Sequence, residues 1–191
     1  MVTHVALLRG INVGGQNKVP MADLREIVSS LGHTDVATYI QSGNVVFTTS
    51  ETDTAKLAAA LEDAIGERTG VRCRVIVLSG VELAQIAQDN PYSGEPNPKA
   101  VHVVFLPAAP APEMIASVAE AQDTVAQKGS RDTAQYVGRA LFLHTPDGFG
   151  RSELATLLTR AGRAMSVKGA GTARNVATVR KLLEMCGGGS D

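Results

Sequence analysis

Cations and small polar residues gather in one segment near the start of the sequence, and their types suit the binding of an anion. The segment from Arg9 to Pro20 carries three glycines between an apolar run and a predicted helix. Glycine permits positive φ, so that successive backbone N–H groups turn toward one anion, and a helix N-terminus adds a favourable partial charge. The candidate binding residues of this loop are Arg9, Asn12, Gly14, Gly15 and Lys18.

The spacing of this loop departs from the known phosphate-binding motifs. A P-loop requires Gly-Lys-Ser/Thr, whereas Lys18 is followed by Val19, and the dinucleotide fingerprint requires Gly-x-Gly-x-x-Gly. We therefore predict no cofactor. The alternative interpretation is that the glycines serve only a tight turn, and the spacing agrees with it.

Three other short stretches combine the same residue types. Gln41, Ser42 and Asn44 lie at a predicted hairpin, whereas Arg151 with Ser152, and Arg174 with Asn175 and Thr178, lie at predicted helix starts. Arginine beside serine or asparagine at a helix start can hold a phosphate through N–H groups and a bidentate guanidinium. Equally, Asn175 or Thr172 can simply cap the last helix while Arg174 pairs with a carboxylate.

Residue types that catalyse reactions are present, but without the spacing that catalysis requires. The four histidines, at positions 4, 33, 102 and 144, form no pair at metal-ligand spacing, so no metal site is predicted. Ser42 and Ser152 stand beside glycines but lack the Gly-x-Ser-x-Gly elbow, and a turn serine and a helix cap explain them more simply. We name no catalytic residue, and the sequence leaves open whether the chain is an enzyme.

Hydrophobic periodicity predicts the elements of residues 1–90. Strands are expected at 4–8, 35–40, 44–49 and 72–78, and helices at 21–31, after Ser50 and after Ser79. Ser50 with Asp53, and Ser79 with Glu82, have the spacing of a capping box. The order β-α-β-β-α-β plus a helix is the ferredoxin-like pattern, with both main helices on one face of an antiparallel sheet.

A similar order follows in the second half of the chain. Residues 91–99 carry prolines and a glycine without periodicity and are predicted to be a linker. In residues 100–186, strands are expected at 101–106, 133–137, 140–144 and 165–168, and helices at 113–121, 152–161 and 175–185. Residues 187–191 are predicted to be a glycine-rich flexible tail. The predicted fold class is α+β, with two ferredoxin-like subdomains of the β-α-β-β-α-β type and antiparallel sheets.

Four stretches also carry a resemblance to a known family. They are Ala6-Leu7-Leu8-Arg9-Gly10-Ile11-Asn12-Val13-Gly14-Gly15 with Asn17-Lys18-Val19-Pro20-Met21, then Thr38 to Phe47, Gly150-Arg151-Ser152, and Thr172 to Asn175 with Thr178, Lys181 and Leu182. By these the chain resembles the bacterial family catalogued as domain of unknown function 1697. The resemblance implies two α+β subdomains related to the ferredoxin-like arrangement and brings no established activity. Glu153 and Val176 depart from the family pattern, where lysine and an aromatic residue are usual.

Composition limits the partners. The net charge is −1, and the three tyrosines and four phenylalanines form no basic-aromatic stripe, so nucleic acid is the less favoured ligand. No run of about 18 apolar residues predicts a membrane span. Cys73 and Cys186 are far apart in sequence and suit free thiols in a reducing compartment. The N-terminus lacks a signal-peptide pattern, so a cytoplasmic location is expected. The expected oligomeric state is a monomer or a homodimer.

Three functions remain as hypotheses. The first is binding of an anionic, phosphate-bearing small ligand by the Arg9–Lys18 glycine loop and the Arg174–Thr178 helix start. The second is a protein–protein interaction or homodimerisation module without catalysis, built on an uncovered sheet face. The third is an enzyme acting on a phosphorylated substrate.

Overall fold

The chain folds into two compact units. The computed structural model describes residues 1–159 and 171–187. Unit 1 contains Met1–Gln85 together with the C-terminal stretch from Lys181, and unit 2 contains Ile86–Arg180. We predicted boundaries at residues 90 and 100, whereas this division falls within two helices. It does so because the end of the last helix packs against Gly80 of unit 1. A Cβ added to Gly80 would lie 3.5 Å from Cys186 Cβ.

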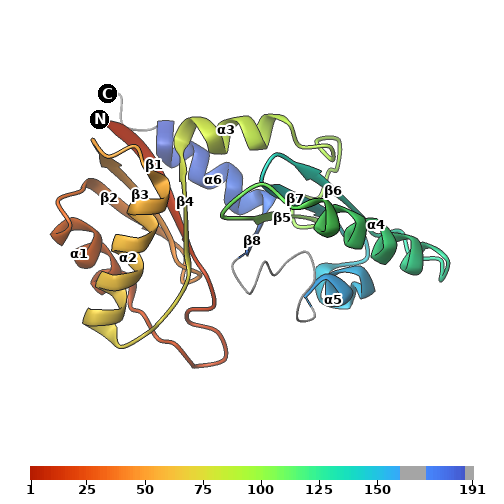
Figure 1. The fold of residues 1–191 in the computed structure, drawn as a ribbon, viewed down its shortest axis with the longest axis horizontal. Helices are drawn as coiled ribbons and strands as arrows, with labels where there is room; N and C mark the ends of the chain where they lie inside the picture. The colour runs from red at the N-terminus through yellow and green to blue at the C-terminus, as the bar shows by residue number, and fades with distance from the viewer. Residues whose placement is uncertain (160–170, 188–191) are drawn as a thin grey trace. The chain divides into compact units, whose positions relative to one another are not determined.

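Unit 1 has the predicted order of elements. They are β1 (Val2–Leu8), α1 (Met21–Ser30), β2 (Thr34–Tyr39), β3 (Asn44–Thr49), α2 (Thr54–Thr69), β4 (Val75–Ser79) and α3 (Gly80–Gln88). The sheet order is β2-β3-β1-β4, and all neighbouring strands are antiparallel. Figure 1 shows α1 and α2 on one side of this sheet, and the loop after β1 running beyond its end.

Alternation along the strands explains why the helices lie on this side. Ala6 and Leu8 of β1 share a core cluster with Phe47 of β3, and the apolar stripes of α1 and α2 pack onto them. Leu24 and Leu61 are the buried centres of those stripes, at 0% and 1% exposure. Burial of one sheet face by two amphipathic helices accounts for the ferredoxin-like order.

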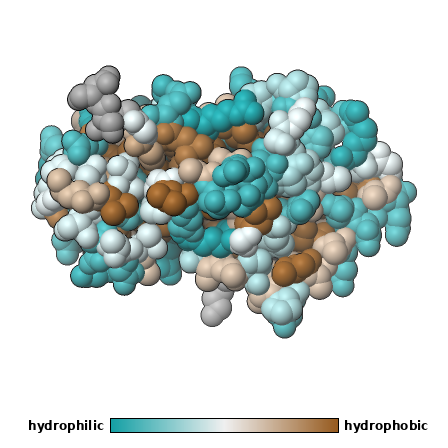
Figure 2. Space-filling view, turned by 90° about the horizontal axis from the view of Figure 1, so that it is seen from above, coloured by the Kyte–Doolittle hydropathy of each residue, from teal (hydrophilic) through white to brown (hydrophobic). Residues whose placement is uncertain are grey.

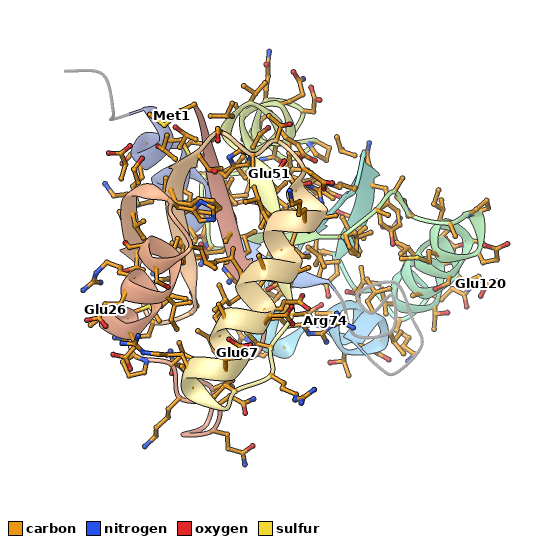
Figure 3. All side chains as sticks on the ribbon, turned by 60° about the vertical axis from the view of Figure 1, so that its left-hand side comes forward. Met1, Glu26, Glu51, Glu67, Arg74 and Glu120 are labelled. Carbon is orange, nitrogen blue, oxygen red and sulfur yellow. The ribbon has the colours of Figure 1, made fainter. Side chains whose placement is uncertain are left out.

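The start of α2 shows how local chemistry sets an element boundary. The predicted capping box placed the cap at Ser50, but the N-cap is Asp53, whose carboxylate accepts from the N–H groups of Ala55 and Lys56. Glu51, labelled in Figure 3, accepts from the Thr52 and Asp53 N–H groups and pairs with Lys56 at 2.6 Å. The Lys56 hydrogen bond and these N–H groups lower the pKa of Glu51 to about 2.

Unit 2 repeats the topology. Its elements are β5 (Val101–Phe105), α4 (Pro112–Ala126), β6 (Thr133–Val137), β7 (Ala140–His144), η1 (Phe149–Arg151), α5 (Glu153–Thr159), β8 (Thr172–Asn175) and α6 (Val176–Gly187). The sheet order β6-β7-β5-β8 is the counterpart of that in unit 1, again antiparallel throughout. The predicted α+β fold with two ferredoxin-like subdomains is confirmed.

The fourth strand of unit 2 differs from the prediction. We expected a strand at 165–168, which lies outside the described residues, and a helix start at Arg174. Instead, residues 172–175 form β8, which pairs with β5 through Val103–Arg174 and Phe105–Thr172. The motif therefore contributes a strand first and the helix afterwards, and Arg174 belongs to the sheet.

The predicted linker lies between α3 and β5 and is made of turns. It is fastened to unit 2, because Glu95 Oε2 lies 2.6 Å from His144 Nε2 and the Tyr92 ring stacks on the His144 ring. Hydrogen bonds from the Asn97 N–H and from His144 lower the pKa of Glu95. A hydrogen bond and a ring stack therefore hold a segment that has no regular structure of its own.

Candidate functional site

Two of the sequence motifs meet at one end of the sheet in unit 1. The backbone N–H of Leu8, the last residue of β1, donates to Gly43 O at 2.8 Å. From the loop after β1, Asn12 Nδ2 donates to Gln41 O at 2.9 Å. The glycine loop and the β2–β3 hairpin are thus one hydrogen-bonded cluster, although about thirty residues separate them in sequence.

Asn12 shapes the loop. Its Nδ2 also donates to Val19 O, and its Oδ1 accepts from the Val19 N–H, both at 2.9 Å. Asn17 Nδ2 donates to Gly10 O at 3.0 Å, and the Asn12 N–H donates to Asn17 O. Both asparagines have positive φ, 55° and 50°, which asparagine tolerates better than most residues. The loop is therefore held by its own side chains.

Gly14 and Gly15 form the tip of this loop. Their φ values are 58° and 78°, and the Gln16 N–H donates to Val13 O at 3.1 Å. Positive φ at both central residues is the signature of a type I′ turn, which the pair Gly-Gly permits. The prediction of positive φ is confirmed, and the turn alone is enough to explain these two glycines.

The hairpin residues have structural partners. Asn44 is fully buried, and its Nδ2 donates to Tyr39 O and to Ser42 Oγ, both at 2.9 Å. Gln41 takes part through its backbone carbonyl. Gly43 has φ 76°, and a Cβ there would lie 2.7 Å from both Ile11 Cδ1 and Leu8 Cβ. The sequence predicted no packing role for Gly43, whose only signal was its place between Ser42 and Asn44 in the predicted hairpin.

The charged residues of the cluster differ in their surroundings. The backbone N–H of Arg9 donates to Arg74 O at 2.9 Å, which fixes the start of the Arg9 side chain. Arg9 Nη1 is buried without a hydrogen-bond partner among the described residues. Arg74, labelled in Figure 3, is paired with Glu62 of α2 at 3.0 Å. Lys18 is exposed. Arg9 therefore carries unsatisfied donor capacity next to a rigid loop.

In unit 2, Ser152 is a helix cap. Ser152 Oγ accepts from the Ala155 N–H at 2.8 Å and donates to Asp132 Oδ2 at 2.7 Å, and Ser152 and Asp132 are 5% and 6% exposed. The Ser152 hydroxyl therefore both donates and accepts a hydrogen bond. Arg151 is exposed, and its charge lowers the pKa of Asp147, after the larger effect of Arg131.

Replacing Ser152 tests this cap. We expect Ser152→Ala to lower the free energy of unfolding by about 1–3 kcal/mol, because it removes a cap and a hydrogen bond to a buried carboxylate. Ser152→Thr keeps the hydroxyl and is the matched control. Chemical denaturation of the purified variants measures the difference, and an unchanged midpoint for Ser152→Ala would contradict the structural role.

The last candidate group is built around a buried cation. Arg174 is 8% exposed and donates from Nη1 to Thr172 Oγ1 at 3.0 Å and to Ala173 O at 2.8 Å. Burial lowers the pKa of Arg174 to about 10, so the guanidinium stays charged at neutral pH. Asn175 Oδ1 accepts from the Thr178 N–H at 2.8 Å and so caps α6. The Thr178 N–H therefore already has a hydrogen-bond acceptor.

The structure thus brings together Arg9, Asn12, Gly14, Gly15, Lys18, Gln41, Ser42 and Asn44, all in unit 1. Arg151, Ser152, Arg174, Asn175 and Thr178 lie in unit 2. The first group is one continuous cluster, whereas the second lies in two segments, one at the start of α5 and one at the β8–α6 junction. Their role in binding stays a prediction.

Groups for other chemistry are scarce among the described residues. No three His, Cys, Asp or Glu side chains there are arranged to hold a metal ion. Burial raises the pKa of both cysteine thiols to about 11, which disfavours the nucleophilic thiolate. Burial also lowers the pKa of His33 and of His102. Within the same residues, no helix is long and apolar enough to cross a membrane.

Comparisons with known proteins agree with this architecture. A conserved bacterial protein from Streptococcus pneumoniae has a similar solved structure, with a TM-score of 0.72 and 22% sequence identity. The match covers 97% of this chain and 98% of that chain. At this identity the likeness shows the fold alone. No curated protein matches the chain.

The family model described as protein of unknown function (DUF1697) matches residues 1–142. This range includes the glycine loop and the hairpin, whereas the motifs at Arg151 and Arg174 lie beyond it. The match agrees with the resemblance carried by the first two sequence stretches, which lie within it. The chain therefore belongs to the DUF1697 family.

Proposed function

We propose that the protein binds an anionic, phosphate-bearing small ligand at the glycine loop of unit 1. The observation that carries this proposal is Arg9. Its Nη1 is buried and has no hydrogen-bond partner among residues 1–159 and 171–187. An unsatisfied buried guanidinium N–H costs free energy, and a phosphate oxygen is the acceptor that a guanidinium binds best.

The rigidity of the loop supports the same proposal. Asn12 ties the loop to both Val19 and the hairpin, so little conformational entropy is lost when a ligand binds. Two consecutive glycines with positive φ lie at the exposed tip, and such backbone conformations are common in anion-binding turns. Lys18, exposed on the same loop, supplies a second full charge.

The β8–α6 junction at Arg174 contributes less to this proposal than the sequence led us to expect. The guanidinium of Arg174 already has a hydroxyl and a carbonyl acceptor, and Asn175 occupies the Thr178 N–H. These contacts favour a role in the β8–α6 junction of unit 2. The proposed binding therefore rests on the residues of unit 1.

Thermal unfolding with a ligand panel tests this function. The panel contains inorganic phosphate, nucleotides, sugar phosphates and short oligonucleotides. A ligand at about 100 times its dissociation constant adds roughly 2.7 kcal/mol of stability, and for a chain of this length that raises the midpoint by roughly 5–10 °C. We expect phosphate compounds to raise the midpoint, and Arg9→Gln to remove the shift.

The matched control is Arg25→Gln. Arg25 belongs to α1 of the same unit, is exposed and donates to Thr38 Oγ1, so its replacement removes the same charge away from the loop. It should leave the ligand shift unchanged. A flat panel, or equal loss in both variants, would refute binding at the loop.

A second candidate function is a protein–protein interaction module. Val13 and Ile40 are 69% and 50% exposed and lie on the two loops that Asn12 joins, and Ile40 has the unusual φ of 48°. On the face drawn in Figure 2, hydrophobic residues lie among hydrophilic ones. Sedimentation over a range of concentrations tests self-association, and Ile40→Ser should weaken it. A cytoplasmic location, where both free cysteines stay reduced, suits either function.

A further inference from the structure

Unit 2 contains a small cavity with apolar walls. Its volume is about 90 Å³, and all of its lining residues belong to Ile86–Arg180. Val103 and Phe142, from β5 and β7, form the wall on the sheet side, and Val176 and Val179 of α6 form another. These four side chains are at most 7% exposed, so the interior is lined by well-buried hydrocarbon.

The rim of this cavity carries hydrogen-bond donors. Asn90, Ser93 and Arg180 line it, and no carboxylate of the described residues does. Asn90 Oδ1 accepts from the Tyr92 N–H at 2.9 Å, which leaves its amide NH₂ as a donor. Neither Ser93 Oγ nor the Arg180 guanidinium has a partner in the described part of the chain. One full positive charge and two neutral donors therefore border one apolar cavity.

This combination is selective for a class of ligand. An apolar cavity stays dry and costs stability when it is empty, so it favours a hydrocarbon group of matching size. A guanidinium with unused N–H groups favours a planar anion that it can bind with two hydrogen bonds. A molecule that satisfies both requirements has an aliphatic chain that ends in a carboxylate.

We propose that this cavity binds a short aliphatic carboxylate. The chain lies against Phe142 and Val179, and the carboxylate accepts hydrogen bonds from Arg180, Asn90 and Ser93. An apolar cavity of about 150 Å³ holds the six carbons of benzene, so a cavity of this volume holds about three or four carbons. The site is separate from the glycine loop and does not depend on the function proposed there.

Titration of the isotopically labelled full-length protein with butyrate tests the proposal. Its matched ligands are butanol, which has the same chain without the charge, and butylamine, in which the charge is reversed. We expect butyrate to cause saturable chemical-shift changes at Val103, Phe142 and Val179. Butanol should bind at least about tenfold more weakly than butyrate. Butylamine should not bind.

Two variants separate the parts of the site. Arg180→Gln, at an exposed position, should reduce butyrate binding to the level of butanol, whereas Lys181→Gln, which removes the neighbouring charge, should not. Ala87→Leu adds bulk to the half-buried part of the wall and should abolish binding of both ligands. The proposal is overturned if butyrate causes no saturable shift at millimolar concentration, if butanol binds equally well, or if Ala87→Leu binds butyrate normally.

Discussion

Gly43→Ala, in the hairpin that packs against the glycine loop, is expected to destabilise the protein more than any other single change considered for this cluster. The added Cβ would lie 2.7 Å from Leu8 Cβ and 2.7 Å from Ile11 Cδ1, and both neighbours are at most 2% exposed. The φ of 76° adds strain for any residue with a Cβ. Together, strain and overpacking should lower the free energy of unfolding by about 2–5 kcal/mol.

Gly15→Ala is the matched control for this change. Gly15 has nearly the same φ, 78°, but no atom lies within 4 Å of its hypothetical Cβ. Only the backbone strain remains, so the loss should be about 1–2 kcal/mol. Denaturation with urea measures both variants. Equal losses would show that the close approach of the hairpin to β1 does not exist in solution.

The second large effect is expected for Asn12→Asp. The substitution keeps the size and the Oδ1 acceptor but replaces the NH₂ group, which donates to Val19 O and Gln41 O, by a carboxylate oxygen. Two carbonyl oxygens then face a negative charge without a proton between them. We expect a loss of about 2–4 kcal/mol at neutral pH.

The pH dependence of this variant gives a direct check. The two carbonyls disfavour the charged form, so the introduced carboxyl has a raised pKa in the folded state. A raised folded-state pKa means that the folded protein binds more protons, so the stability deficit should shrink as the pH falls toward 4. Asn17→Asp is the control, because within the described residues the Asn17 amide donates one hydrogen bond, to Gly10 O, and the loss of stability should be about 1 kcal/mol. A deficit that grows on acidification would contradict the assigned hydrogen bonds.

Local sequence patterns determined most of the fold. The apolar run from Val75 to Leu78 and the apolar stripes of the helices led directly to two ferredoxin-like subdomains. The hairpin β6–β7 has the predicted bounds, because Gly138 with φ 55° is the turn signal that the sequence displays. Such features depend on residues a few positions apart, which is why they can be seen in one sequence.

The predictions failed where contacts between residues distant in sequence determine the structure. Arg174 resembles a residue that opens a helix, but pairing of Thr172 and Arg174 with β5, about seventy residues earlier, makes the segment a strand. Asp132 is absent from the candidate residues because nothing in its neighbourhood shows that it meets Ser152, twenty positions away.

For the candidate site, the sequence by itself determined the residue types, the glycine-rich loop and the family. Only the tertiary structure decided that the loop and the hairpin form one cluster, through Asn12 and the backbone of Gly43. It also decided that Ser152 and Asn175 are caps, whereas Arg9 keeps a buried donor without a partner in the described residues. The physical reason is that hydrogen-bond satisfaction depends on which groups meet in space, and this is set by packing rather than by spacing along the chain.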